Sequence, residues 1–306
     1  MAMPLSIIAI TAAAFGLIAL SPPAFADDAL HYGLGARVGA RQLEFDFSAM
    51  ALPSFVSDGG GTILLENSGG EVEFGIDEAL YFVGLWGGLF VEGFSVTGQI
   101  EISTEESSRV SSYTEEFADL SGNRASDISR VDYSFTLSYA LIQGLSLFSG
   151  FKHTKFEASA REDSFLLGLK DQTYQEEGFF LGTSYVWHFE SLLSLSLSLA
   201  YAYLDLDFSE DGAERPTALG PVSFGEFSYN GTARGLSVGV QANFPITDNW
   251  YYNAGIMYQE YVSKNNSSTL DVFPRAEGLV STPAQVVDLD TEHADTVLTI
   301  GLQYIF

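Results

Sequence analysis

The sequence of 306 residues has no cysteine, few basic residues and, after its first 26 residues, no long hydrophobic run. Without cysteine no disulfide can hold the fold together, and closure of a β-barrel is one of the other ways to do so. Lys and Arg number 13 against 40 Asp and Glu, a net charge of −27, so we expect no nucleic-acid partner. The lack of any later stretch of about 18 apolar residues excludes a membrane-spanning helix there. A closed β-barrel is then the remaining way to satisfy backbone hydrogen bonds inside a membrane.

The first 26 residues carry no charge and are mostly apolar. They end in Ala24-Phe25-Ala26, and small residues at this spacing after a hydrophobic core form a signal-peptidase cleavage site. We therefore predict a secretory signal peptide at residues 1–26 and one barrel domain at residues 27–306. The basic residue that usually stands near the start of a signal peptide is absent, and a membrane anchor is the alternative.

The C-terminal residues 295–306, DTVLTIGLQYIF, alternate between two faces with a period of two, as β-strands do. Their number is close to the roughly 9–11 residues of a transmembrane β-strand. The run Ile300, Leu302, Tyr304 and Phe306 resembles the C-terminal signature of bacterial outer-membrane β-barrels, which their assembly machinery recognises. This resemblance implies a barrel in the outer membrane of a Gram-negative bacterium, and the last strand of a soluble sandwich is the alternative.

Nine further segments show the same alternation. In the most regular one, residues 193–203, Leu or Tyr alternates with Ser or Ala, whereas an amphipathic helix would repeat its apolar positions every three or four residues. The first strand changes parity near Gln42, where we expect a bulge or the exit from the membrane. With the C-terminal strand, the predicted strands are 31–47, 73–85, 89–103, 130–141, 145–156, 179–189, 193–203, 227–244, 249–261 and 295–306.

The connections between these strands alternate between long and short. Outer-membrane barrels have long external loops, short periplasmic turns and an even number of strands. We therefore predict an all-β fold, a single transmembrane antiparallel barrel of about ten strands. The first long connection has room for a small hairpin, and Glu92 interrupts an apolar face in the third strand. The long connections are 48–72, 104–128, 157–177, 209–225 and 263–292, and the short ones are 86–88, 143–144, 190–191 and 245–248.

Charged residues fall on the predicted inner face of the barrel. In a narrow barrel such charges usually pair with one another and fill the lumen. A charged constriction that selects solutes is the functional alternative. Because ten strands leave little open bore, we expect a water-lined but mostly filled interior. The candidate constriction residues are Arg37, Arg41, Arg130, Asp132 and, on the second strand, Asp77.

In strand number and loop plan the chain resembles the omptins, outer-membrane proteases that use an acidic pair facing an Asp–His pair. The acidic residues Asp205 and Asp207 have no histidine beside them, and only His153 and His293 are expected near the barrel mouth. A lipid hydrolase would need a serine near a lipid-facing histidine, but the only serine on the strand face of His153 stands four residues away, about 13 Å. We therefore expect no enzyme.

The sequence shows no metal-ligand spacing, phosphate-binding glycine loop or nucleophile elbow, so we expect no cofactor. Acidic residues concentrate in the long connections, which suits a solvated surface or contact with lipopolysaccharide through divalent cations. The expected partners are outer-membrane lipid, lipopolysaccharide and the barrel assembly machinery, and we expect a monomer. The predicted function is a small porin-like passive channel for small solutes. A surface structural or adhesion protein acting through its acidic loops is the alternative.

Overall fold

The computed structural model describes residues 30–306, except for 52–53, 58–62, 68–69, 104–108, 116–119, 161–171, 190–192, 211–213, 218–219, 275–279 and 282–283. In this part of the chain every regular element is a β-strand. It contains no helix with the length and apolar character needed to cross a membrane. The predicted signal peptide and the predicted turn at 190–191 lie outside the described residues.

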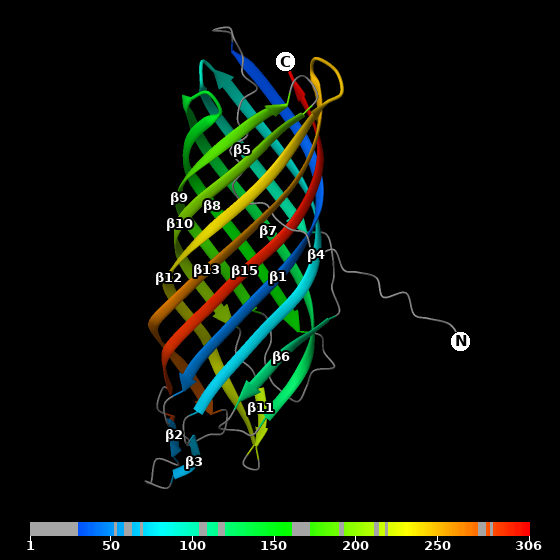
Figure 1. Cartoon of the computed structure of the whole chain (residues 1–306). Helices are drawn as coiled ribbons and strands as arrows, with labels where there is room; N and C mark the ends of the chain where they lie inside the picture. Colours follow the sequence, from blue (N-terminus) through cyan, green and yellow to red (C-terminus); the bar gives the residue numbers. More distant parts are fainter. Residues whose placement is uncertain are drawn as a thin grey trace, which may run out of the picture.

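Ten antiparallel strands form a closed barrel (Figure 1). The barrel closes because β1 pairs along one edge with β4 and along the other with the last strand, β15. This arrangement confirms the predicted ten-stranded antiparallel barrel. Its strands are β1 (His31–Ala51), β4 (Gly70–Val91), β5 (Phe94–Ser103), β7 (Leu120–Ile142), β8 (Leu145–Ala160), β9 (Gln172–Phe189), β10 (Leu193–Glu210), β12 (Gly220–Pro245), β13 (Trp250–Pro274) and β15 (Ala284–Ile305).

The two ends of the barrel differ. The C-terminus lies at one end, here called the short-turn end, while the additional short strands lie towards the other, the long-loop end (Figure 1). Two of these strands complete the wall, since β6 pairs with β4 and β7, and β11 pairs with β12. Three others form a separate sheet, which confirms a small hairpin within residues 48–72. The short strands are β2 (Ser54–Ser57), β3 (Ile63–Asn67), β6 (Arg109–Glu115), β11 (Glu214–Thr217) and β14 (Val280–Ser281).

Outward-facing apolar side chains form a belt around the part of the barrel near the short-turn end. We call it the apolar belt. Such a belt is the lipid-facing surface of a transmembrane barrel. On β15 the outward residues include Ile300 and Leu302, and on β13 they include Trp250 and Tyr258, as predicted. The belt also includes Leu34, Val38, Tyr81, Leu85, Leu89, Phe94, Ile100, Tyr133, Phe135, Leu137, Phe179, Leu181, Trp187, Leu197, Leu199, Tyr201, Leu236, Val238 and Ile256.

The strands continue well beyond this belt, so the predicted bounds of most long loops are wrong. The 25 residues of β13 rise about 60 Å at a tilt near 40°, whereas the apolar band of such barrels is about 25 Å tall. Beyond the belt the alternation reverses its polarity, with apolar side chains inside and polar ones outside. The outer parts of the strands therefore no longer resemble lipid-facing strands in sequence.

The change of parity near Gln42 marks this reversal and is not a bulge. The pairing of β1 with β15 runs without a register shift from Gly33 to Ser48. Leu43 and Phe45 point into the barrel and are buried, while Glu44 on the other face is exposed. The prediction of a membrane exit at this point agrees with the polarity, and the alternative of a bulge is wrong.

The predicted turn at residues 86–88 is also wrong, because these residues lie inside β4. The chain turns at Glu92 and Gly93, which have φ angles of 38° and 78°. Positive φ at both central residues is the geometry of a tight two-residue hairpin. Glu92 is therefore at the tip of a turn and does not interrupt a lipid-facing strand. Trp86 points into the barrel and is buried.

Inward glycines leave room for the inward aromatic rings on neighbouring strands. A Cβ atom at Gly35 would lie 2.6 Å from Cε2 of Trp86, and one at Gly182 would lie 2.6 Å from Cε2 of Phe148. Real Cβ atoms do not approach other heavy atoms so closely, since packed interiors leave no slack. These glycines are therefore explained by packing inside the lumen, and the rings fill much of the space that a ten-stranded wall encloses.

We predict that Gly182→Val destabilises the barrel by about 1–3 kcal/mol, the usual cost of overpacking. The new Cβ would also lie 2.5 Å from the carbonyl oxygen of Leu199. The matched control is Gly98→Val on the lipid-facing side, where the nearest heavy atom would be 4.0 Å away. The midpoint temperature of the heat-modifiable gel shift measures both variants. Equal midpoint temperatures for the two variants would contradict the claim that aromatic rings pack against the inward glycines.

Candidate functional site

Arg37 and Arg41 of β1 point into the barrel and meet carboxylates from two other strands. Nη2 of Arg37 lies 2.6 Å from Oε1 of Glu101, and Nη2 of Arg41 lies 2.9 Å from Oε2 of the same residue. Nη1 of Arg41 lies 2.6 Å from Oδ2 of Asp132. Because residues of a strand alternate between faces, the four-residue spacing places both arginines on the inner face. Glu101 therefore bridges two guanidinium groups.

Arg130 of β7 links two walls of the barrel. Its Nε lies 2.9 Å from Oδ2 of Asp132 on its own strand. Its Nη2 lies 2.8 Å from Oδ2 of Asp295, and its Nη1 donates a hydrogen bond of 3.0 Å to Oδ1 of that residue. Since β7 and β15 are four positions apart in the ring of ten strands, this double contact spans the lumen. Two parallel N–H bonds to one carboxylate are a strong and geometrically specific pairing.

His293 extends the contacts to β9. Its Nδ1 lies 3.1 Å from Oε2 of Glu176, and its Nε2 lies 3.4 Å from Oδ2 of Asp295 and 3.2 Å from Nη1 of Arg130. The hydroxyl of Tyr174 donates a 2.5 Å hydrogen bond to the other oxygen of Glu176. The imidazole thus lies between two carboxylates, and all these side chains are buried.

Lys152 and Gln259 complete the set from β8 and β13. The amide nitrogen of Gln259 donates a 2.5 Å hydrogen bond to Asp295, and its oxygen lies 3.3 Å from Nζ of Lys152. The ammonium also lies 4.2 Å above the ring of Tyr261, a cation–π geometry. Thr154 donates a 2.7 Å hydrogen bond to Asp132. Each charged group therefore has a partner on a different strand or beside it.

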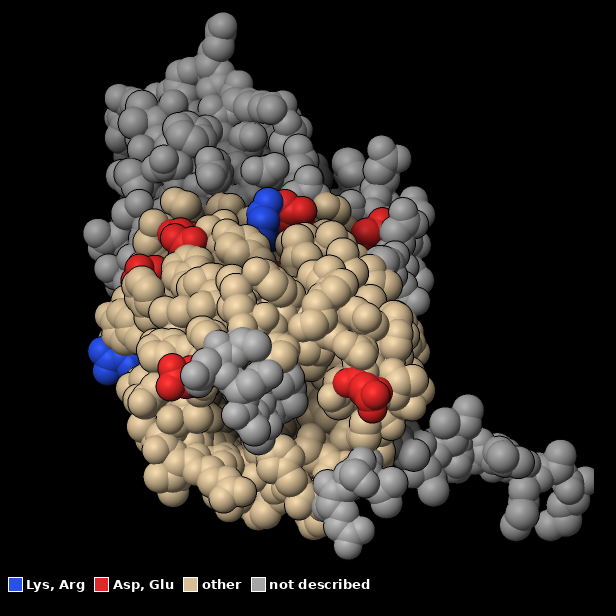
Figure 2. All heavy atoms as spheres, turned by 90° about the horizontal axis from the view of Figure 1, so that it is seen from above, with Lys and Arg blue, Asp and Glu red and all other residues tan. Residues whose placement is uncertain are grey.

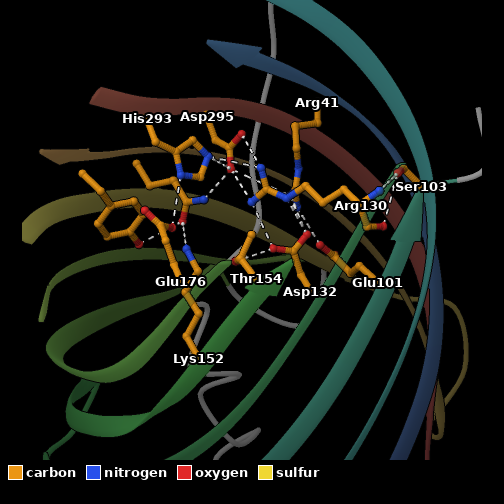
Figure 3. A network of polar contacts seen from close by, with 12 residues as sticks. Arg41, Glu101, Ser103, Arg130, Asp132, Lys152, Thr154, Glu176, His293 and Asp295 are labelled. Atoms are coloured by element: carbon orange, nitrogen blue, oxygen red, sulfur yellow. Dashed lines mark hydrogen bonds and ion pairs between the residues drawn. The ribbon is translucent and has the colours of Figure 1, made fainter. Parts of the chain in front are cut away.

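We call the charged members of this set the lumen network (Figure 3). Four basic side chains face four carboxylates, and all except Asp132, whose side chain is 14% exposed, are buried. Buried charge is tolerated when it is paired and hydrogen-bonded, so the pairing of these groups allows the network to exist inside the barrel. Its members are Arg37, Arg41, Arg130, Lys152, Glu101, Asp132, Glu176, Asp295 and His293.

Four of the five candidate constriction residues lie together in the lumen, namely Arg37, Arg41, Arg130 and Asp132. Asp77 does not join them. It is exposed on the outer wall, where it accepts a hydrogen bond from Gln42. The inner face of β4 is apolar at this level, because Leu80 and Phe82 of the opposite parity are the buried residues.

Sequence reasoning did not identify Glu101, Glu176, Lys152, His293 or Asp295 as network members, and the first two were missed for different reasons. Glu101 stands between Ile100 and Ile102 on one strand, and this alternation by itself predicts that Glu101 points into the barrel. Glu176 lies in a segment that was predicted to be loop. Only the continuation of β9 beyond the belt places it inside the barrel.

Beyond the network the lumen is filled by apolar side chains. We call these residues the apolar cluster, and each is at most 4% exposed. They come from eight strands and belong to one continuous core. The barrel is therefore sealed on the long-loop side by the described side chains alone. The cluster consists of Leu43, Phe45, Leu80, Ile128, Phe156, Ala158, Tyr174, Leu204, Leu206, Phe208, Tyr229, Ala233 and Tyr261.

The residues weighed as enzyme candidates are not brought together. Asp205 and Asp207 are exposed on the outer wall and do not face the mouth. His153 also faces outward, where it stacks on Tyr133 with ring centroids 4.4 Å apart and lies 3.2 Å from Glu177. Across the described residues, no group of three or more His, Asp and Glu is arranged to hold a metal ion.

The chain matches no protein-family model and no curated protein at a significant level. Among solved structures it is similar to the outer membrane protease OmpT from Escherichia coli, with 11% identity, a TM-score of 0.58, and coverage of 90% of this chain and 97% of that one. It also aligns with the outer membrane protein OprG from Pseudomonas aeruginosa at 11% identity and a TM-score of 0.35, over 88% and 95% of the two chains. The similarity to OmpT is one of fold, so the chain has the fold of Gram-negative outer-membrane β-barrels.

We predict that Asp295→Asn lowers the free energy of unfolding by about 3–5 kcal/mol, because it leaves part of Arg130 buried without its anionic partner. The matched control is Asp205→Asn on the exposed outer wall, which should change stability by less than about 0.5 kcal/mol. Unfolding in urea, followed by tryptophan fluorescence in detergent, compares the two. A shift for Asp295→Asn no larger than that of the control would show that the network does not brace the barrel.

Proposed function

We propose that this protein is an outer-membrane barrel that is closed to flow through its lumen and acts at its long-loop end as a surface structural or binding protein, not as an enzyme. The observation that carries the proposal is the apolar cluster, which fills the lumen beyond the network. Apolar side chains packed at interior density leave no continuous path for water or ions. A barrel closed in this way holds its external end rigidly.

The outer wall supports an external position for this end. Outward-facing charged side chains beyond the apolar belt belong in water and cannot face hydrocarbon. Eleven of them are acidic and only Lys155 and Arg234 are basic, in the part of the wall whose side chains are described. The acidic ones are Glu44, Asp46, Asp77, Asp127, Glu157, Glu177, Asp205, Asp207, Glu260, Asp290 and Glu292.

The porin-like channel predicted from the sequence is the weaker candidate. A passive channel needs a continuous polar path across the membrane. Any such path between the described strands would cross both the lumen network and the apolar cluster. The passive channel stays a prediction, and conduction would require these side chains to move apart. We propose that the outer surface of the barrel contacts outer-membrane lipid and lipopolysaccharide. We also propose that the barrel assembly machinery recognises the C-terminal signature.

We also infer that the chain is not a hydrolase of the omptin or lipid-cleaving kind. Catalysis by a histidine requires a nucleophile or a water within hydrogen-bond reach. The outward-facing His153 lies 3.2 Å from Glu177, and the inward His293 is enclosed by Glu176, Asp295 and Arg130. Both histidines already contact carboxylates of the protein, which supports structural roles for them.

In planar lipid bilayers we expect no stepwise current from the purified barrel, because the lumen is sealed. Arg37→Ala and Arg41→Ala should leave the traces flat unless loss of the network opens the cluster as well. A porin of known conductance, recorded in the same bilayers, is the positive control. Stepwise currents from the unaltered barrel whose size changes in the two variants would contradict the closed barrel and restore the channel.

Surface binding is tested by replacing residues 275–283 with a short Gly-Ser linker. This replacement leaves β13 and β15 intact and removes β14, which pairs with β2 at the long-loop end. We expect the intact protein to confer adhesion to gelatin or glass on bacteria that carry it, and the variant to lose this adhesion. The heat-modifiable gel shift checks that the barrel still folds. Equal adhesion with and without the segment would count against a binding role for this loop.

A further inference from the structure

The two halves of the lumen differ in character, although the rings of Trp86, Phe148 and Phe180 fill part of the short-turn half as well. On the short-turn side of the network the inward side chains are mainly polar and uncharged. We call this region the lower lumen; Figure 1 draws this end of the barrel at the top. Aromatic rings lie on its glycines, but between the rings the wall offers hydroxyl and amide groups. The polar residues are Ser95, Thr97, Gln99, Ser134, Thr136, Ser138, Ser146, Ser184, Ser194, Ser196, Ser198, Gln241, Asn243, Asn253, Thr299 and Gln303.

Solvent reaches part of the lower lumen. Thr97 and Gln99 of β5 point inward and are nevertheless partly exposed. Since their side chains face away from lipid, the surface that they expose can only be the barrel interior. The members of the apolar cluster, by contrast, are at most 4% exposed. Any connection of this surface to bulk solvent must therefore run towards the short-turn end.

Several buried polar atoms of the lower lumen have no partner in the protein. They are Oγ of Ser138 on β7, and Oγ1 of Thr299 and Oε1 of Gln303 on β15, and each residue is at least nine-tenths buried. A buried hydroxyl or amide without a hydrogen bond is costly, so such atoms normally bind water or another polar molecule. Because β7 and β15 are well separated in the barrel wall, these unpaired atoms lie on two different sides of the lumen.

The charge of the lower lumen indicates what it can take up. Arg37 lies where the lower lumen meets the lumen network. It forms an ion pair with Glu101 and donates a 2.9 Å hydrogen bond to Gln99. The other polar groups are neutral donors and acceptors. The short-turn end itself shows few charged side chains among the atoms that Figure 2 colours. Neither entry nor binding therefore favours an ionic solute.

We propose that the lower lumen is a one-sided vestibule, which admits water and small neutral hydrogen-bonding molecules from the short-turn side and ends blindly at the lumen network. Hydroxyl and amide groups on the wall replace part of the hydration of such molecules. The vestibule goes beyond the proposed surface function but shares one element with it, the seal formed by the network and the apolar cluster.

The absence of native cysteine makes accessibility directly measurable. Ser138→Cys and Thr299→Cys place single thiols in the lower lumen, and both substitutions nearly conserve volume. Ala158→Cys and Ala233→Cys, each 1% exposed, place matched thiols in the apolar cluster. The probe is methyl methanethiosulfonate, which is small and neutral. Because this probe crosses lipid, glutathione, which does not, is kept on the opposite side of the membrane to consume any probe that leaks through. It is added to either side of proteoliposomes whose orientation is established by protease cleavage of the long loops, and mass spectrometry reports the modified fraction.

We expect complete modification of Ser138→Cys and Thr299→Cys from the short-turn side, and no modification of either from the long-loop side. The two cluster variants should stay unmodified from both sides. Failure of both lower-lumen thiols to react in a heat-modifiable barrel would overturn the vestibule and leave the closed surface barrel standing. Reaction of these thiols from the long-loop side would overturn the seal, and with it the proposed function.

Discussion

The constraint on which this structure depends is that a chain crossing a membrane must satisfy its backbone hydrogen bonds within itself. Here β1 meets that constraint by pairing with both β4 and β15, which leaves the ring without a free edge. Ten strands enclose only a narrow interior, so every inward side chain must fit and find partners there. The glycines beneath Trp86 and Phe148 and the pairing of Arg130 with Asp295 are two solutions to this one problem, the first steric and the second electrostatic.

The polarity of the wall reverses along the barrel, and the lumen network lies at the level of this reversal. Within the apolar belt the outside is apolar and the inside polar, whereas beyond it Leu43 and Phe45 are inside and Glu44 is outside. The same strands thus form a membrane barrel at one level and a barrel with a water-soluble pattern at the next. An apolar core excludes water more completely than paired charges do, so the seal is strongest beyond the membrane.

The sequence was sufficient where one face of a strand meets lipid. The C-terminal run from Ile300 to Phe306 and the Leu–Ser alternation of residues 193–203 are strands in the structure, and Arg37 and Arg41 do face inward. It was insufficient where the reason for a residue lay on another strand. The glycines after Trp86 resemble a turn until the ring of that residue is seen inside the barrel, and Glu176 resembles a loop residue until His293 is seen opposite it.

The network also explains why the lumen can be both charged and closed. A lone buried charge would draw in water or a counter-ion, because its desolvation is costly. Four basic groups against four carboxylates remove that need, and the cross-lumen pairs Arg41–Asp132 and Arg130–Asp295 hold separated strands together. His293 lies between Glu176 and Asp295 and adds a fifth group that can carry positive charge, so the pairing of each charged group, and not equal numbers, keeps the network buried. On the short-turn side of the network, hydrogen-bonding demand remains at Oγ of Ser138, Oγ1 of Thr299 and Oε1 of Gln303, and these three groups are neutral.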